Sequence, residues 1–412
     1  PPPSFGLDAP CARPYKDAMK ITLLTPAGPG THTANGITTA VTNLVAGLKA
    51  GGHEISSVAM DIDAPHDDPR VIKVESRPWT LMEKLRARLF DKDMAQQVIA
   101  GQIAEAVART VTEFGAEIVV MEETQGWSSV VQDRVDVPVV VTLHCPWFMH
   151  KDFQPVSGSP ADLRREAREA AALKRSVGIT APSQNVLEAT EKAVGLGAVP
   201  RTVVANPIPL APETPAAERR PDSLLFVGRF ERIKGGDTVL EAFERLAPQH
   251  DTATLTFVGP DRGVARPGQP KLSIDAALAA LPPQVAERVT YTGQLPSGDI
   301  AGLRRTHDIT LIASRYENLN YSMLEAMACG SAIISTNVGG PAEVLEHDRT
   351  ALLVPPDDPE AMAAACLRLP QDPALAQSLR SAARADIEAR FLPEEVGRQM
   401  ADFLQKILDQ QR

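Results

Sequence analysis

Two successive series of short apolar runs, each run followed by a stretch of helical periodicity, constrain the fold of this chain most. The first series is KITLLTP (20–26), EISSVAM (54–60), EIVVMEE (117–123), VPVVVTLH (137–144), VGITAPS (177–183) and TVVANPI (202–208). The second is DSLLFVGRF (222–230), TATLTFVGP (252–260), RVTYTGQ (288–294), DITLIAS (308–314), SAIISTN (331–337) and ALLVPP (351–356). Strands that alternate with helices form parallel sheets covered on both faces. The sequence therefore predicts an α/β protein with two doubly wound, Rossmann-like domains facing a central cleft.

Length and local composition suggest where the domains end. At 412 residues the chain is too long for one ordinary core. We expect a disordered leader at 1–18, an N-terminal Rossmann-like domain at 19–208 and a linker at 209–221, where proline and charge are frequent. A C-terminal Rossmann-like domain is expected at 222–392. The amphipathic helix within 393–412 is expected to cross back to the first domain.

Charge and cysteine content exclude several classes of protein. The net charge of −10 argues against a general nucleic-acid binder, which needs a basic surface. The four cysteines form neither a CxxC nor a Cys/His pattern, so we expect no metal site and no disulfide framework. No apolar run approaches the roughly 20 residues that span a bilayer. A cytoplasmic location is the expectation that fits these features.

Two loops at predicted strand ends carry glycine or positive charge. Ligands of open parallel sheets gather at the carboxyl ends of strands, where loops lead into helix N-termini. The loop PAGPGTHTANG ends at Gly36, whose amide can approach an anion, although a tight turn explains the glycines equally well. In GRFERIK, Gly228 is followed by Arg229 and then by Lys234, which we expect to open the next helix. Two cations at this spacing can clasp a diphosphate; the alternative is a pair of solvated charges.

A third loop, within SRYENLNYSMLEAMACG, supplies carboxylates and amides. Glu317 ends the predicted strand-to-helix loop, and the amides of Asn318, Leu319 and Asn320 lie near the start of the next helix. Such amides can receive phosphate oxygens. Glu325 follows within the helix, among apolar neighbours that favour partial burial and therefore a partner. A ribose diol is one such partner.

These segments together resemble one family. GRFERIKG, then the pair Glu317 and Glu325, then STNVGGPAEV are similar in content and order to the GT-B glycosyltransferases of family 4. The resemblance implies a retaining transfer of a hexose-type sugar from a UDP- or GDP-sugar to a hydroxyl acceptor, with no metal and no cofactor. It implies that the domain at 19–208 binds the acceptor and the domain at 222–392 the nucleotide sugar. It also implies that Arg229 and Lys234 neutralise the diphosphate, that Glu317 contacts the donor sugar and that Glu325 contacts the ribose.

The resemblance also extends to the first half of the chain. It implies that His144, in TLHCP, lies near the sugar and the acceptor, and that amides around Gly36 reach phosphate when the domains close. One departure is that Leu319 and Asn320 stand where the family often has Phe-Gly. The alternative functions are an epimerase or phosphorylase of the same fold, or a non-enzymatic sensor of sugar nucleotides.

Acceptor recognition is expected in the N-terminal domain. The residues WFM at 147–149 can line an apolar acceptor pocket or belong to the core. Residues 77–92 combine apolar side chains at helical spacing with basic ones, which suits an anionic membrane surface and a lipid-linked acceptor; an ordinary surface helix is the alternative. We interpret the DID sequence at 61–63 as a solvated loop rather than a metal motif. His32 stays ambiguous beside the proposed phosphate loop.

Overall fold

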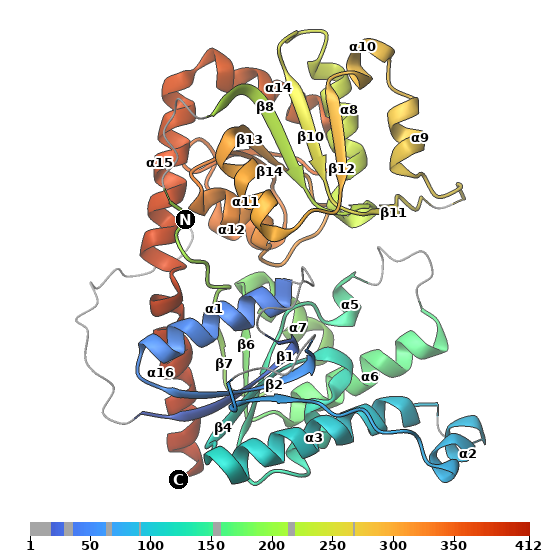
Figure 1. Ribbon diagram of the computed structural model, residues 1–412, viewed down its shortest axis with the longest axis vertical. Coiled ribbons are helices and arrows are strands. Elements are labelled where there is room, and N and C mark those ends of the chain that lie inside the picture. The colour runs from blue at the N-terminus through green and yellow to red at the C-terminus, as the bar shows by residue number, and fades with distance from the viewer. Residues whose placement is uncertain are drawn as a thin grey trace.

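The computed structural model describes residues 18–28, 36–62, 68–89, 92–150, 158–212, 219–266 and 268–412. His32, Asp63, most of the leader and 213–218 of the linker lie outside these ranges. The described chain forms two α/β domains, one above the other in Figure 1. This arrangement confirms the predicted fold class.

The N-terminal sheet has seven parallel strands in the order β3-β2-β1-β4-β5-β6-β7. One of its inner strands, β1, is buried along nearly its whole length, because helices cover both faces of the sheet. The strands are β1 (Lys20–Ala27), β2 (Glu54–Asp61), β3 (Val71–Lys73), β4 (Ile118–Glu122), β5 (Val139–Thr142), β6 (Gly178–Ala181) and β7 (Arg201–Val203).

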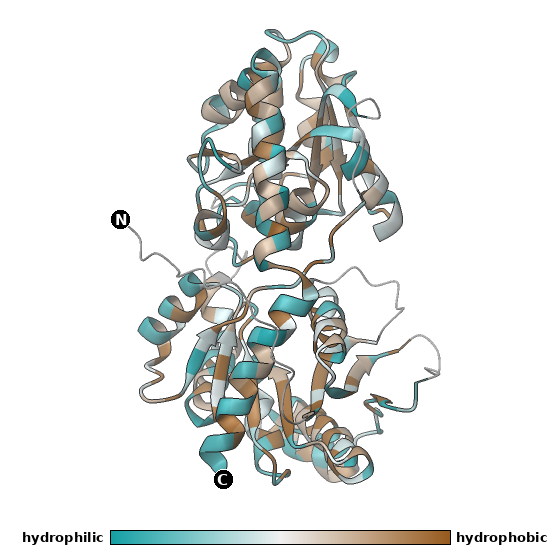
Figure 2. Ribbon diagram, turned by 90° about the vertical axis from the view of Figure 1, so that its left-hand side faces the viewer, coloured by the Kyte–Doolittle hydropathy of each residue, from teal (hydrophilic) through white to brown (hydrophobic). Residues whose placement is uncertain are grey.

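The C-terminal sheet has six parallel strands in the order β12-β10-β8-β13-β14-β15, and β9 pairs with β11 beside it. Figure 2 shows apolar strands enclosed by helices whose outer faces are more polar. The strands are β8 (Arg220–Val227), β9 (Phe230–Glu231), β10 (Thr254–Val258), β11 (Asp261–Gly263), β12 (Val289–Gly293), β13 (His307–Ile312), β14 (Ala332–Thr336) and β15 (Leu352–Val354).

Helices connect the strands in both domains. In the N-terminal domain they are α1 (Gly36–Ala50), α2 (Leu81–Leu89), α3 (Met94–Phe114), η1 (Thr124–Gly126), α4 (Ser128–Gln132), α5 (Trp147–His150), α6 (Pro160–Arg175) and α7 (Gln184–Val194). In the C-terminal half they are η4 (Arg232–Lys234), α8 (Gly236–Leu246), α9 (Ile274–Ala279), α10 (Pro283–Ala286), α11 (Ser297–Thr306), α12 (Tyr321–Ala328), α13 (Gly339–Val344), α14 (Pro359–Gln371), α15 (Pro373–Arg390) and α16 (Pro393–Gln411).

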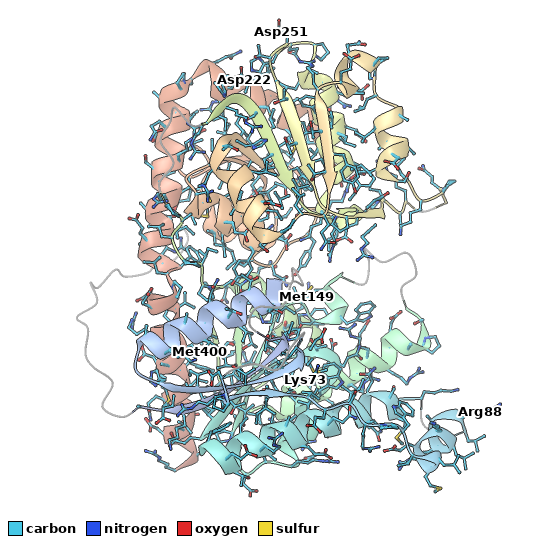
Figure 3. The ribbon with its side chains drawn as sticks, viewed as in Figure 1. Lys73, Arg88, Met149, Asp222, Asp251 and Met400 are labelled. Carbon is cyan, nitrogen blue, oxygen red and sulfur yellow. The ribbon has the colours of Figure 1, made fainter. Side chains whose placement is uncertain are left out.

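The last helix, α16, packs on α1 of the first domain. A pair of glycines makes the close approach possible: a Cβ on Gly47 would lie 1.8 Å from the carbonyl oxygen of Pro393, and one on Gly397 would lie 2.5 Å from the carbonyl carbon of Gly47. The apolar face of α16 then joins the core formed by β1, β4 and α1, and Figure 3 places Met400 against α1. The chain therefore enters the C-terminal domain and returns to complete the N-terminal one.

Two local features differ from the sequence prediction. The strand expected over 202–208 pairs only as β7, Arg201–Val203, and the chain then leaves the sheet towards Pro207, which has no N–H to donate. Lys234 does not open a helix. It ends the short turn η4, and α8 starts at Gly236, because Gly235 adopts a left-handed conformation with φ 68° that breaks the turn.

Candidate functional site

The strongest charge pair at the cleft joins Lys234 to Glu317. Lys234 Nζ lies 2.5 Å from Glu317 Oε2, with the two side chains 24% and 12% exposed. Burial raises the pKa of Glu317, but the Lys234 ammonium and hydrogen bonds from Asn320 and Ser314 outweigh it, so the pKa lies below its ordinary value. A cation and an anion thus stand side by side at the carboxyl ends of β8 and β13. Each can change partners when a substrate enters.

Two glycines of α13 support the Glu317 loop from behind. A Cβ on Gly340 would lie 1.3 Å from the carbonyl oxygen of Asn318, and one on Gly339 would lie 1.9 Å from that of Glu317. Gly339 also has a φ of 49°. The glycine pair at 339–340 therefore serves the close approach of two backbone segments.

The substitution Gly340→Ala is expected to displace this loop. Because the collision is with backbone, the loop must move as a whole, and we expect donor binding to weaken at least about tenfold. Isothermal titration with the donor nucleotide measures the change. The matched control is Gly298→Ala in α11, where an added Cβ meets nothing within 4 Å. Equal donor affinity in both variants would contradict the proposed role of Gly340.

Asn320 has a clear structural role in the same loop. It is the N-cap of α12, where its side-chain oxygen accepts a hydrogen bond from the amide of Met323 at 2.7 Å. Its φ of −82° is ordinary, so a glycine is unnecessary here. Leu319 is buried beneath it, 3% exposed, in the apolar cluster around α12. The departure from Phe-Gly is thus compatible with a regular helix start.

Glu325, on α12, has the partner that its apolar neighbours led us to expect. Arg304 of α11 donates to it at 2.8 Å and to Ser322 Oγ at 3.0 Å. The Arg304 side chain is 1% exposed, whereas that of Glu325 is 37% exposed. Arg304 therefore holds one face of the carboxylate, and the other face remains accessible to a ligand.

On the opposite side of the cleft, three titratable groups cluster at the ends of β4 and β5. His144 Nε2 lies 2.5 Å from Glu122 Oε2. Glu123 accepts the amides of His144 and Cys145 at 2.9 and 2.8 Å. Burial lowers the pKa of His144, but Glu122 reverses this and raises it above its ordinary value. Burial raises the pKa of Glu123 to about 7.

The folded protein therefore holds protons that the unfolded chain would release near neutral pH. For both Glu123 and His144 the folded pKa exceeds the unfolded one, so their stabilisation is lost as pH rises. We expect the Tm to fall between about pH 5 and pH 8, with Glu123 contributing at most about 1.4 kcal/mol per pH unit.

Thermal unfolding across that range checks the expectation. Glu123→Gln should make the Tm depend less steeply on pH. The variant should also have a lower Tm at every pH, because the side-chain N–H of the glutamine would face a backbone N–H that the carboxylate accepts. Glu54→Gln, at an exposed position on β2, is the control. A slope unchanged by Glu123→Gln would exclude Glu123 as its source.

Several contacts connect the two domains across the cleft. The side-chain amide of Asn318 donates to the carbonyl of His144, and Asn206 Nδ2 donates to the carbonyl of Leu319 at 2.7 Å. Glu343 of α13 accepts the amides of Gln184 and Asn185 at the start of α7, at 2.8 and 2.5 Å. The Glu317 loop, which includes Asn318, and the His144 loop are therefore in direct contact.

Gly36, Gly228 and Arg229 occupy different places around this cleft. A Cβ on Gly36, the first residue of α1, would lie 3.7 Å from the ring of Tyr321 on α12, so the two helix starts face each other. Gly228 lets the chain pass close to Phe226, 2.9 Å from an added Cβ. The Arg229 side chain is 52% exposed and bound to Glu231 at 2.6 Å. The structure does not bring Arg229 to the Lys234–Glu317 pair.

The segment at 147–149 forms the short helix α5 and is half-buried. Trp147 stacks beneath the guanidinium of Arg165 at 4.3 Å, while Met149 accepts a hydrogen bond from Tyr316 at 3.4 Å and lies between the domains in Figure 3. Sequence reasoning missed Glu122, Glu123 and Arg304. The two carboxylates had a signal, since both end a strand, but nothing in the sequence paired Arg304 with Glu325.

Comparisons with known families agree with this architecture. Residues 34–211 match the family described as Glycosyltransferase Family 4, and residues 221–372 match that described as Glycosyl transferases group 1. Glycogen synthase of Mycobacterium tuberculosis is 30% identical over 62% of this chain, a match that spans 60% of the relative's length. D-inositol 3-phosphate glycosyltransferase of Jonesia denitrificans is 26% identical over 87% of this chain and 88% of the relative.

Solved structures share the fold. Sucrose-phosphate synthase from Thermosynechococcus elongatus superposes with a TM-score of 0.75 at 23% identity, over 95% of this chain and 99% of that one. HepE from Anabaena, in complex with UDP-glucose, gives 0.66 at 19% identity, over 94% and 100%. The two facing domains are therefore those of the GT-B class. The chain belongs to the group 1, family 4 glycosyltransferases.

Proposed function

We propose that the protein transfers a hexose-type sugar from a UDP- or GDP-sugar to a hydroxyl acceptor with retention of configuration. The observation that carries this is the Lys234–Glu317 pair at the cleft, held against the His144 loop by Asn318. The names of the relatives support a sugar-transfer reaction, and the UDP-glucose complex of HepE supports a uridine diphosphate donor.

The chemistry of the cleft suits departure of a diphosphate. As the glycosidic bond to phosphate breaks, negative charge develops on the leaving group and positive charge on the sugar. Lys234 and the N-terminal end of α12 stabilise the first, as preorganised positive groups do at other sites of charge development. Glu317 and the pair Glu122–His144 face the sugar. In this mechanism the leaving phosphate accepts the acceptor's proton, and neither a metal nor a cofactor takes part.

A panel of UDP-, GDP- and ADP-sugars tests the proposal. Release of nucleoside diphosphate that depends on an added acceptor, together with a product of retained anomeric configuration by NMR, is the expected result. Three other results would contradict a transferase. Epimerised sugar nucleotide would indicate an epimerase, phosphorolysis of a glycoside a phosphorylase, and binding without turnover a non-enzymatic sensor.

We also propose that α2 contacts an anionic membrane and that the acceptor is lipid-linked. The large apolar side chains of α2 are exposed: Leu81 83%, Met82 74%, Leu85 50% and Leu89 57%. Lys84, Arg86 and Arg88 lie on the same helix, which projects from the N-terminal domain with Arg88 at its outer end in Figure 3. An apolar face beside basic side chains matches the interface of anionic lipids.

Co-sedimentation with liposomes tests the membrane contact. We expect pelleting with phosphatidylglycerol vesicles, little with phosphatidylcholine vesicles, and loss of pelleting when Lys84, Arg86 and Arg88 are changed to glutamine. Changing Arg398 and Lys406 on α16, together with Arg412 directly after it, is the matched control. Unchanged pelleting of the α2 variant would reject this surface. No helix within the described residues has the length and apolar character to cross a bilayer.

A further inference from the structure

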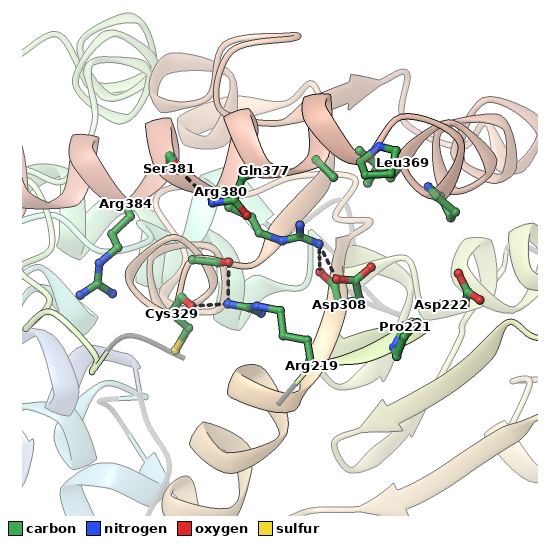
Figure 4. A pocket seen from close by; sticks show the side chains of 14 residues that line it. Arg219, Pro221, Asp222, Asp308, Cys329, Leu369, Gln377, Arg380, Ser381 and Arg384 are labelled. Carbon is green, nitrogen blue, oxygen red and sulfur yellow. Dashed lines mark hydrogen bonds and ion pairs between the residues drawn. The ribbon is translucent and has the colours of Figure 1, made fainter. Parts of the chain in front are cut away.

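A second cavity lies in the C-terminal domain, away from the cleft. It has a volume of about 460 Å³ and opens between the start of β8, the end of α12 and the α14–α15 connection. Arg219 precedes β8 and Asp308 is near the start of β13, so the cavity lies at the amino ends of the strands. The loops that carry Lys234 and Glu317 lie at the opposite, carboxyl ends of the strands. Figure 4 shows its lining side chains.

Three arginines line this cavity. Arg380 donates to Asp308, and its buried Nε has no hydrogen-bond partner within the described chain. Arg384 is 15% exposed, with Glu388 at 3.7 Å. Burial and the nearby Arg380 charge hold the pKa of Arg219 below its usual value. Positive charge is therefore concentrated here.

Two carboxylates, Asp222 and Asp308, line the cavity beside its three arginines. Asp308 is the carboxylate engaged by Arg380. Asp222, at the rim, is held by the Thr252 hydroxyl at 2.6 Å and faces His250 at 3.0 Å. Clustered guanidinium groups suit a phosphate, because their planar N–H donors match its oxygens.

The remaining wall is apolar. It is formed at the α14–α15 connection by Leu369, Pro370, Pro373 and Ala376. A volume of this size is in the range of pockets for small organic ligands and exceeds what inorganic phosphate alone would fill. The cavity thus combines a cationic end with an apolar end, which suits a molecule that carries both a phosphate and an organic body.

Two of these arginines, Arg219 and Arg384, hold the C-terminal end of α12. Arg219 Nη2 donates to the carbonyls of Cys329 and Gly330 at 2.9 and 2.8 Å, and Arg384 Nη1 donates to that of Ala328 at 2.6 Å. The N-terminal end of α12 directly follows the Glu317 loop, and Glu325 lies on the helix itself. A ligand that draws these guanidinium groups away from α12 acts on an element of the donor site.

We propose that this cavity binds a small phosphorylated metabolite, with its phosphate on Arg219, Arg380 and Arg384 and its organic part on the α14–α15 wall. When the cavity is occupied, the affinity for the sugar donor changes through α12. This second step rests on the proposed function. The binding step does not depend on that function.

Isothermal titration of the full chain with ribose 5-phosphate, inorganic phosphate and ribose tests the binding step. We expect saturable binding of ribose 5-phosphate, weaker binding of inorganic phosphate and none of ribose. Gln377→Glu, which puts a carboxylate at the rim, and Arg384→Gln should each weaken binding at least about tenfold. Ser378→Glu, an exposed position on the same helix outside the cavity lining, and Lys234→Ala at the cleft should bind as the parent protein does.

Each contrary result rejects a stated part of the proposal. Absence of saturable binding, equal loss in Gln377→Glu and Ser378→Glu, or loss in Lys234→Ala rejects the cavity as the site. Equal affinity for phosphate and ribose 5-phosphate rejects the apolar wall as a contact. Circular dichroism confirms that each variant is folded.

The coupling step is measured separately. Saturating ribose 5-phosphate should shift the donor KM by at least about twofold in the parent and in Ser378→Glu, and not in Gln377→Glu. Binding without a change in KM rejects the coupling and leaves the site. Absence of transfer in every variant and with every donor counts against the proposed function and leaves the binding result unaffected.

Discussion

Replacing Lys234 with alanine is expected to lower kcat by about 10³-fold while the protein stays folded. Lys234 is the cation held in the cleft, only 24% exposed, and it lies 2.5 Å from Glu317. Without it, charge that develops on the diphosphate lacks its nearest compensating group, and Glu317 also loses its ion pair. Steady-state kinetics with the donor identified by the panel measures the effect.

Arg262→Ala is the matched control for that experiment, because Arg262 is an exposed cation on β11 of the same domain. It should retain the parental kcat. Lys234→Arg should recover part of the activity, since the charge returns with a different shape. A Lys234→Ala enzyme within about threefold of the parent would remove Lys234 from the mechanism.

The second large effect is expected for Glu317→Gln, which should reduce kcat by about 10² to 10³-fold. The side chain keeps its size and its place beside Ser314, so the loop remains supported. What disappears is the negative charge that pairs with Lys234 and that, in the proposed mechanism, faces the donor sugar. Kinetics of this variant beside Glu231→Gln, a neighbouring carboxylate on β9, separates loss at the site from loss of charge in general.

The two substitutions should not add. Residues in direct contact couple by about 0.5–3 kcal/mol, so the double variant Lys234→Ala, Glu317→Gln should lose less activity than the two single effects combined. Full additivity of the two effects on kcat would indicate that the residues act independently. The ion pair seen between them would then be incidental to catalysis.

The parallel sheets were predictable because their strands are buried on both faces and read as nearly continuous apolar runs. The runs KITLLTP and DSLLFVG predict β1 and β8 in this way. The Lys234 and Glu317 loops were predictable as site candidates for a related reason: charged and polar residues directly follow such strands. Their pairing at 2.5 Å was not, because 83 residues separate them.

Other parts of the site depend on tertiary contacts that no local pattern encodes. Arg304 reads as an ordinary basic residue of an exposed helix, and only packing buries it against Glu325. Glu123 reads as the polar end of a strand, yet it fixes the amides of His144 and Cys145. Gly340 looks like a turn residue in the sequence. Its role in the structure is to leave room for the backbone of Asn318, which a Cβ at this position would meet.

The return of α16 to the first domain bears on how the protein is made. Val396, Met400 and Leu404 are part of the same core as Ile21 and Leu48, so that core contains side chains from both ends of the described chain. On a ribosome, the N-terminal sheet emerges long before this helix does, and its α1 face remains uncovered until α16 has been made. Domains generally fold in the order in which they are made. Here the second domain can close its own sheet first, and the earlier one is completed last.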